Sequence, residues 1–274
     1  MKPQLLHLPL STCPDASSFT IVDNAIDLAR QHGADLLASI PQVRVPPIHQ
    51  PFPTTIDVDS WRAQAETYSR DSGSSIQSYI ADAVSKTGIE VRIRGFETRE
   101  PYVYNSFAEI SMVHDLSIVE ACELTRQLSE TLLFGSGRPL LLFPTSSVCA
   151  RVDTVAIAWD GSAAAARAIS CAHLFMERAM KLQVISITDD KQIDEANRSL
   201  LIASLRHSGF EVEDVPVQAG GESAAAAIQT AALERKADIL VAGGFGHSRL
   251  REFILGGVTR ELLGKSELPV LLAH

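Results

Sequence analysis

Features that mark several common protein classes are scarce in this sequence of 274 residues. Its four cysteines form no CxxC pair and have no short Cys/His spacing, which argues against a zinc site and indicates isolated thiols. Apolar runs are short, and the stretch from Leu5 to Leu10 is interrupted by His7 and Pro9. None approaches the roughly 18 residues of a membrane span. We therefore expect a cytoplasmic chain with neither a membrane segment nor a secretory signal.

Basic residues are also fewer than acidic residues in this sequence. The chain has 24 lysines and arginines against 33 aspartates and glutamates, which gives a net charge of −9. This balance argues against a nucleic-acid coat or a protein that binds anionic membranes, because both need clustered basic residues. Hydrophobic residues make up 46% and charged residues 21%, as in ordinary globular proteins. The length suits two domains of about 130 to 140 residues each.

Strands and helices are predicted to alternate along the second half of the chain. Short apolar runs predict strands, and longer stretches that end in turn residues predict helices, with Ser223 as one N-cap. The predicted strands are 152–159, 182–187, 210–217, 238–242 and 268–273, and the predicted helices are 163–180, 191–208, 223–236 and 258–263. This alternation favours an α/β fold, in which helices cover both faces of an open parallel sheet of five strands.

The first half repeats this order less clearly. It predicts strands at 5–8, 34–40 and 89–95 and helices at 18–31 and 57–86. The segment from Thr131 to Pro139 matches residues 261–269 almost position for position, and the pair His114–Asp115 matches Ala237–Asp238. We therefore predict two homologous domains, 1–146 and 150–274. The copies are unequal, because seven residues of the later copy, in its glycine-rich stretch, have no counterpart in the earlier one.

That glycine-rich stretch is the first candidate binding site. Gly243 and Gly246 follow a predicted strand, while Gly256 and Gly257 precede a predicted helix whose first turn contains Thr259. Ligands of open parallel sheets bind where strands end, and glycines and helix N-termini turn main-chain N–H groups toward anions. The stretch is therefore suited to a polyphosphate. The alternative is that these glycines only serve tight turns.

These residues resemble a known family. The spacing Gly243-x₂-Gly246-x₉-Gly256 is similar to the glycine motif G-x₂-G-x₉-G-[ST] of ATP-binding universal stress proteins. The strand that ends at Asp160-Gly-Ser and the final apolar strand resemble other landmarks of that family. The resemblance covers nearly all of residues 150–274, and it extends to the first half as a degenerate copy, as in tandem members. One position departs from the motif, because Gly257 stands where the family has Ser or Thr.

The resemblance implies two flavodoxin-like, Rossmann-like domains and an ATP site, with or without Mg²⁺, in the second. Carried over by position, the binding residues are Asp160, Ile187, Gly243, Gly246, Gly256, Gly257, Val258 and Thr259. Asp160 would lie near the ribose or adenine, Ile187 would offer main-chain contacts to adenine, and the others would surround the ribose and phosphates. Two alternatives remain open: Asp160 could instead cap the following helix, and Trp159 could either stack on a base or fill the pocket.

The function implied is that of a nucleotide-binding regulatory stress protein with little or no catalysis. We identify no catalytic residue and no metal site in the sequence, and Glu261 and Lys265 are interpreted as a helix-stabilising ion pair. The alternatives are a weak ATPase and a scaffold that binds no nucleotide or another small molecule. The resemblance also implies that residues 268–273 pair with a partner domain, so that the two halves form a pseudo-dimer, and a homodimer is a further expectation.

Overall fold

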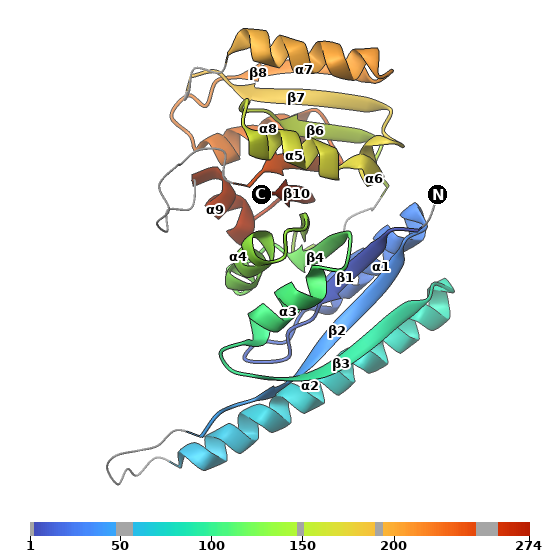
Figure 1. Cartoon of the computed structure of the whole chain (residues 1–274), viewed down its shortest axis with the longest axis vertical. Helices are drawn as coiled ribbons and strands as arrows, with labels where there is room; N and C mark the ends of the chain where they lie inside the picture. The colour runs from blue at the N-terminus through green and yellow to red at the C-terminus, as the bar shows by residue number, and fades with distance from the viewer. Residues whose placement is uncertain (1–2, 48–56, 147–150, 190–193, 245–256) are drawn as a thin grey trace.

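The computed structural model describes residues 3–47, 57–146, 151–189, 194–244 and 257–274. Ten strands in this part of the chain form one sheet, in the order β3-β2-β1-β4-β5-β10-β9-β6-β7-β8 (Figure 1). Within the same ranges, no helix combines the length and the apolar character needed to cross a membrane.

Residues 5–143 form one half of the sheet and residues 154–273 form the other. The first half contains β1 (Leu5–Pro9), α1 (Phe19–His32), β2 (Asp35–Arg44), α2 (Val58–Thr87), β3 (Val91–Arg99), α3 (Val103–Ser111), β4 (Leu116–Glu120), α4 (Arg126–Gly135) and β5 (Leu140–Phe143). The second half contains β6 (Thr154–Ala158), α5 (Ala163–Cys171), α6 (His173–Met176), β7 (Lys181–Ile187), α7 (Glu195–His207), β8 (Glu211–Val217), α8 (Ala224–Glu234), β9 (Ile239–Gly243), α9 (Gly257–Gly264) and β10 (Val270–Ala273).

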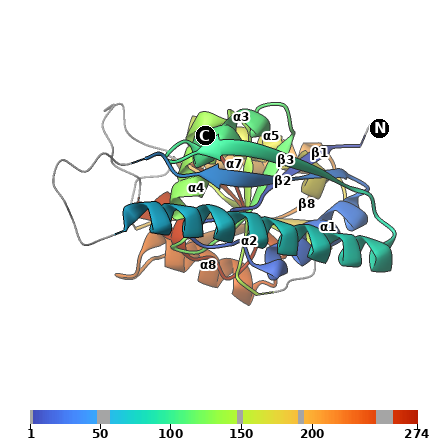
Figure 2. The same ribbon diagram turned by 90° about the horizontal axis from the view of Figure 1, so that it is seen from below.

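Each half is a doubly wound α/β unit. Its strands run in the order third, second, first, fourth, fifth, and all neighbours within a half are parallel. The connections place α1 and α2 on one face of the first half and α3 and α4 on the other, as Figure 2 shows for α2 and α3. This confirms the predicted fold class of open five-stranded parallel sheets with helices on both faces.

The two halves meet through their last strands. β10 pairs with β5 in antiparallel register, from Val270 opposite Leu142 to Leu272 opposite Leu140. Both strands are fully buried, and the two hydrophobic cores, one on each face of the sheet, contain residues from both halves. The sheet and both cores are therefore continuous across the junction.

Equivalent polar contacts in the two halves support the internal duplication. Asp115 and Asp238 stand just before β4 and β9, and each carboxylate accepts main-chain hydrogen bonds at the start of the neighbouring first strand of its half. Asp115 Oδ2 accepts from Leu5 N at 2.8 Å, and Asp238 Oδ2 accepts from the N–H groups of Asp153 and Thr154, both at 2.8 Å. The same two positions were matched by sequence, so they perform the same structural task in both halves.

Helix boundaries depart from prediction where tertiary contacts intervene. The helix predicted over residues 163–180 is wrong as a single element, because α5 ends at Cys171 and the short α6 follows after Ala172. Phe175 of α6 is buried and stacks edge-on against His32 of α1 in the first half, with ring centroids 5.4 Å apart. Docking against the other half therefore accompanies the break, which no glycine or proline in the sequence signals.

A buried histidine lies in the core of the first half. His7 of β1 bonds Ser111 Oγ through Nδ1 at 2.7 Å and Ser39 Oγ through Nε2 at 2.6 Å, and its ring stacks on that of His114. Burial, together with the charges of the neighbouring His114 and Arg94, lowers the pKa of His7 to about 3. His7 is therefore neutral in the folded protein and serves as a hydrogen-bonded core residue.

Candidate functional site

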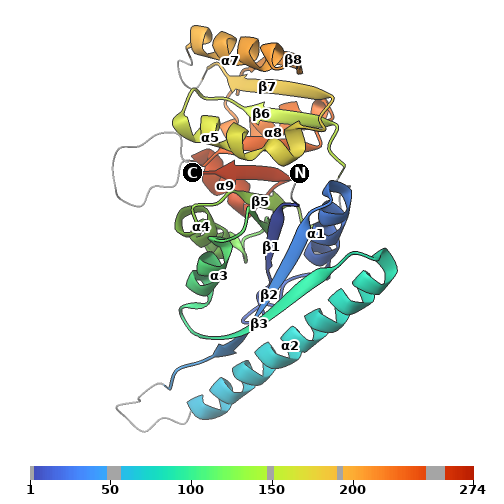
Figure 3. The same cartoon turned by 45° about the vertical axis from the view of Figure 1, so that its right-hand side comes forward.

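The carboxyl ends of β6, β7 and β9 lie side by side in the second half. Figure 3 shows β6 and β7 next to each other. Ala158, the last residue of β6, is paired with Ile185 on one side and Ala242 on the other. The chain leaves β6 toward β7, while β9 lies on the opposite side, so the strand order reverses between β6 and β9. Ligands of doubly wound folds bind in the crevice outside such a reversal. The structure therefore brings the predicted residues Asp160 and Gly243 to this edge.

Asp160 lies directly after β6 and shapes the turn into α5. Its Oδ1 accepts a hydrogen bond from Ser162 N at 3.0 Å, and Ser162 Oγ accepts one from Ala165 N at 3.1 Å. Ser162 is thus the N-cap of α5, and the Asp160 carboxylate supports the turn before it. The carboxylate stands at the strand end, as expected for a residue that contacts a ligand there.

Trp159 fills the core instead of standing free in the cleft. Its side chain is 8% exposed, and its indole Nε1 donates a hydrogen bond to Asn197 Oδ1 of α7 at 3.1 Å. The tryptophan therefore holds α7 against the turn after β6. No local pattern in the sequence marks Asn197 for this contact, because its partner lies 38 positions away.

Ile187 ends β7 with its side chain buried. Ile185 O accepts a hydrogen bond from Trp159 N at 2.8 Å, so the main chain of Ile185 faces β6. Alternate residues of a parallel strand turn their main-chain groups to the same side, so those of Ile187 face the region just beyond the end of β6. This is the orientation that main-chain contacts to a base would need.

The first two glycines of the stretch are packed tightly. A methyl group on Gly243 would lie 2.5 Å from Ala165 N and 2.7 Å from Ala164 C, so α5 approaches β9 only because this residue has no side chain. Gly244 N donates to Ala273 O at 2.7 Å, and a methyl group there would lie 3.0 Å from Leu133 Cδ2 of α4. Close packing is therefore one reason for these two glycines.

The start of α9 is open by comparison. Gly257 is exposed, and a methyl group on it would meet no atom of the other described residues within 4 Å. Val258 is partly exposed, whereas Thr259 is buried, with 3% of its surface accessible. Gly246 and Gly256 lie outside the described residues. Of the predicted residues at the start of α9, Gly257 and Val258 are therefore the ones accessible to a ligand.

The predicted ion pair on α9 is not formed. Glu261 Oε1 instead accepts a hydrogen bond from Ser223 Oγ at 2.9 Å, and Lys265 Nζ lies 3.8 Å from Glu267. Ser223 is the N-cap of α8, as predicted, since its Oγ also accepts from Ala226 N at 3.0 Å. Glu261 therefore links α9 to the first turn of α8, a contact between helices that sequence spacing could not reveal.

Two loops at the same edge are joined by Asp189. Its carboxylate accepts hydrogen bonds from Ala219 N at 2.7 Å and Gly220 N at 3.0 Å. These bonds, that from Gly220 foremost, lower the pKa of Asp189 below its usual value, so the side chain stays ionised at neutral pH. Asp189 thereby ties the segment after β7 to the segment after β8.

The corresponding edge of the first half is closed by Glu120. When Asp115 is aligned with Asp238, Glu120 falls opposite Gly243. Its Oε1 accepts a hydrogen bond from Ser18 Oγ, the N-cap of α1, at 2.7 Å. A cavity of only about 10 Å³ remains beside these residues, room for a single water at most. A carboxylate thus stands where the second half has a glycine.

The described residues contain no group of three or more His, Cys, Asp or Glu side chains arranged to hold a metal ion. The site consists instead of main-chain groups, one carboxylate and the beginning of a helix.

Comparison with known proteins assigns the half that contains this site. Residues 151–274 match the model of the universal stress protein family. The C-terminal half of this chain is a universal stress protein domain. A universal stress protein of Synechocystis sp. is 26% identical over 145 residues, which are 52% of this chain and 49% of that protein. The match thus spans about half the length of that relative.

Solved structures resemble the chain over both halves. A universal stress protein from Archaeoglobus fulgidus superposes with a TM-score of 0.73 at 18% identity, covering 98% of this chain and 96% of that one. A putative universal stress protein from Pseudomonas aeruginosa UCBPP-PA14 has a TM-score of 0.58 at 15% identity, covering 99% of this chain and 93% of that one. A functionally unknown protein from Pseudomonas aeruginosa PAO1 has a TM-score of 0.57 at 15% identity, covering 97% and 92%. At these identities the likeness concerns the fold, and it places the universal stress protein domain within a two-part architecture.

Proposed function

We propose that the universal stress protein domain binds ATP at the edge formed by the ends of β6, β7 and β9. The chain would then act as a nucleotide-binding regulatory protein of the cytoplasm, with little or no catalysis. In this proposal Asp160 contacts the ribose or adenine, the main chain of Ile187 contacts adenine, and the start of α9 faces the phosphates. Membership of the family, the strand order and the orientation of Ile187 support this assignment.

The main support is a difference between the two halves at the end of their fourth strands, beside the point where the strand order reverses. The second half has Gly243 at the end of β9, whereas the first half has Glu120 at the equivalent position, hydrogen-bonded to the N-cap of α1. A carboxylate there repels the phosphates of a nucleotide, and its side chain occupies the space. We therefore assign one nucleotide site to each chain, in the second half.

Calorimetric titration of the full chain with ATP, ADP and AMP tests the proposal, together with native mass spectrometry of protein purified without added nucleotide. We expect one ATP per chain. Gly257→Ser should tighten binding, because the added hydroxyl has open space and supplies the donor found in the family motif. A hydrogen bond of about 1 kcal/mol corresponds to roughly fivefold in Kd.

The matched control is Gly257→Ala, which adds a methyl group without a hydroxyl. It should leave the ATP affinity close to that of the original protein. Absence of a bound nucleotide in the mass spectrum, and of heat with all three nucleotides for both the original protein and Gly257→Ser, would overturn the proposal.

The second candidate is a scaffold without a nucleotide. The continuous sheet and cores across the β5–β10 junction favour it, since they bind the halves into one body whatever the cleft holds. A chain that takes up no nucleotide yet unfolds in one cooperative transition would support this alternative. Measurable phosphate release at saturating ATP would instead favour a weak ATPase.

A further inference from the structure

The strand at one end of the sheet, β3, has a long and regular outer edge, which we call its free edge because no other strand of the described residues pairs with it. It stands beyond β2, at the opposite end from β8 (Figure 1). All nine of its residues are in register with β2, from Val91 opposite Leu36 to Arg99 opposite Arg44. Typical strands have five or six residues, and a long edge without a bulge is a template for another strand.

None of the residues of β3 whose main-chain groups face away from β2 is a proline. Glu100 N donates to Arg44 O at 3.0 Å, so the even-numbered residues of this strand face β2. Val91, Ile93, Gly95 and Glu97 therefore turn their N–H and C=O groups away from the sheet. These residues could form a complete ladder of hydrogen bonds with an added strand.

The other edge of the sheet is protected. In β8, Val217 O accepts a hydrogen bond from Thr188 N at 2.8 Å, so Val217 faces β7 and its neighbour Pro216 faces outward. Proline has no N–H to offer there, and such prolines are a common protection against edge pairing. β8 also carries acidic residues that are engaged in ion pairs, such as Glu213 with Lys181 at 2.7 Å. The two edges thus differ in both hydrogen-bonding capacity and charge.

The charge of β3 is positive in a chain of net charge −9. Arg92, Arg94 and Arg99 are all exposed. Glu97 is the one acidic residue of β3, and Arg44 of β2 neutralises it at 3.1 Å. Arg92 lies 3.9 Å from Asp35, a distance at which two exposed groups interact weakly. The free edge therefore presents arginines to an incoming segment.

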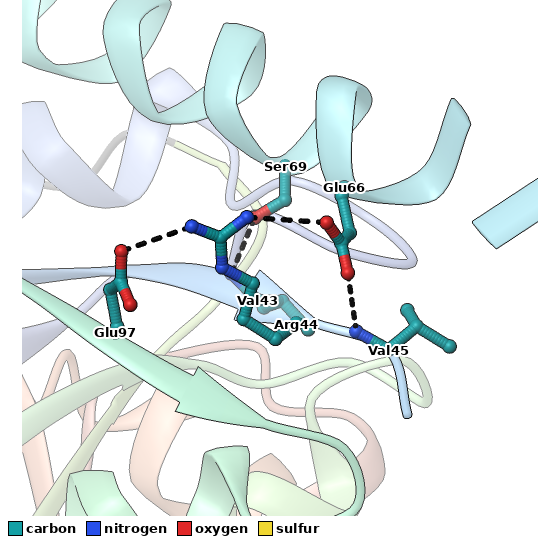
Figure 4. A network of polar contacts seen from close by, with 6 residues as sticks. All are labelled: Val43, Arg44, Val45, Glu66, Ser69 and Glu97. Atoms are coloured by element: carbon teal, nitrogen blue, oxygen red, sulfur yellow. Dashed lines mark hydrogen bonds and ion pairs between the residues drawn. The ribbon is translucent and has the colours of Figure 1, made fainter. Parts of the chain in front are cut away.

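The carboxyl end of this edge is held in place by a polar network (Figure 4). Arg44 bridges Glu97 of β3 and Glu66 of α2, the latter at 3.2 Å, and Glu66 also accepts from Val45 N at 3.1 Å. Ser69 of α2 accepts from Val43 N at 3.0 Å. These bonds fix β2 and β3 against α2, so the edge would lose little conformational freedom when a strand is added.

A groove lies at the same end of the strand. It measures about 510 Å³, and its described lining includes Arg44, Glu97, Thr98 and Arg99, with Glu97 paired to Arg44. A segment paired along β3 could place a terminal side chain in this groove beside Arg99. Pockets next to a strand edge give selectivity in known cases of strand addition.

We propose that the free edge of β3 binds an acidic peptide segment in extended conformation, which adds an eleventh strand to the sheet. The ladder of main-chain hydrogen bonds supplies affinity, and the three arginines select carboxylate side chains. This site is separate from the proposed nucleotide site, because β3 lies at the far end of the sheet in the first half.

Fluorescence anisotropy of labelled nine-residue peptides with the full chain tests this proposal. The probe alternates Glu and Thr, a second peptide alternates Lys and Thr, and a third keeps the glutamates but has proline in place of alternate threonines. We expect the Glu/Thr peptide to bind, and the other two to bind at least roughly tenfold more weakly, because they lack the charge or the N–H donors. Slowed hydrogen exchange at Ile93 and Gly95 in the complex would locate the peptide.

Protein variants supply matched controls. Ile93→Pro removes an outward N–H without breaking a bond to β2, as Pro216 does in β8, and should weaken binding roughly tenfold. Ile93→Val keeps the N–H and should bind normally. The pair Arg92→Gln and Arg94→Gln should weaken binding, whereas Arg167→Gln on α5 should not.

Three results would each overturn the proposal: no binding of the Glu/Thr peptide, equal binding of the glutamate and lysine peptides, or equal binding of the proline-containing peptide. In the first case the arginines only protect the edge from aggregation. If Ile93→Pro does not fold, the proline-containing peptide tests the same hydrogen bonds from the other side.

Discussion

Replacement of Gly243 by alanine should destabilise the protein sharply, although it adds a single methyl group. Gly243 ends β9 at the point where α5 crosses it. The new carbon would lie 2.5 Å from Ala165 N and 2.7 Å from Ala164 C, both main-chain atoms in the first turn of a helix. Main-chain atoms cannot rotate away as the end of a side chain can, so α5 or β9 must shift.

The size of the effect follows from two opposing contributions. Overpacking in a close-packed interior costs typically about 1 to 3 kcal/mol, and a clash with main-chain atoms belongs at the upper end of this range. Loss of glycine freedom in the unfolded chain offsets about 0.4 to 1 kcal/mol of this cost. We therefore expect the free energy of unfolding to fall by about 2 kcal/mol. For a chain of this size the melting temperature should then fall by about 4 to 8 °C.

Urea and thermal unfolding followed by far-UV circular dichroism measure this change. Gly257→Ala is the matched control, because a methyl group there meets no atom within 4 Å in the part of the chain that the structure describes. Its unfolding free energy should change by no more than about 0.5 kcal/mol. The comparison separates a glycine required by packing from one that a ligand could require.

Equal stability of Gly243→Ala and the original protein would refute the packing argument, and it would show that α5 can move away from β9 at little cost. Equal destabilisation by the two substitutions would also refute it, since the two sites would then share a cause other than the approach of α5.

Three further predictions concern the rest of the chain. Asp238→Ala should lower the free energy of unfolding more than Asp115→Ala, because Asp238 accepts two main-chain hydrogen bonds and Asp115 accepts one. Each such bond is worth about 1.5 kcal/mol or more when the acceptor is charged. The urea midpoints of the two variants check this order. Burial lowers the pKa of His7 to about 3, while the unfolded chain titrates near its ordinary value of about 6.5, so the unfolded state binds the extra proton between these values. Stability should therefore fall as the pH drops through this window, by up to about 1.4 kcal/mol per pH unit, and His7→Gln should remove that part of the slope; an equal slope in both proteins would contradict the assignment. Finally, Trp159 is 8% exposed and Trp61 is 63% exposed. The Trp61→Phe variant should therefore show a blue-shifted tryptophan fluorescence that acrylamide quenches poorly. A red-shifted, readily quenched fluorescence would place Trp159 in water.

Local sequence patterns suffice to predict most strands and helices of this chain. Buried parallel strands are short apolar runs, and their succession with helices was readable because each element carries its own pattern. Ser223 was recognisable as an N-cap, since capping involves residues only three positions apart. The match of Asp115 with Asp238 revealed the duplication, and both carboxylates indeed make equivalent bonds.

The candidate site was readable only in part. The family resemblance led to Asp160 and Gly243, and the structure brings both to one edge. The role of Glu120 depended on a contact with Ser18, 102 residues earlier. The alignment that sets Glu120 opposite Gly243 was available in the sequence, but the closure of that edge also requires the position of α1.

By itself the sequence predicted the fold class, the two repeated halves and the resemblance of the second half to its family, because periodicity, caps and spaced glycines are local properties. The tertiary structure alone decided that β10 pairs with β5 to make one sheet, that α5 requires Gly243 to lack a side chain, and that β3 is left as a free basic edge. These outcomes depend on which surfaces meet across long separations in the chain. They follow from packing and strand pairing, which no local pattern records.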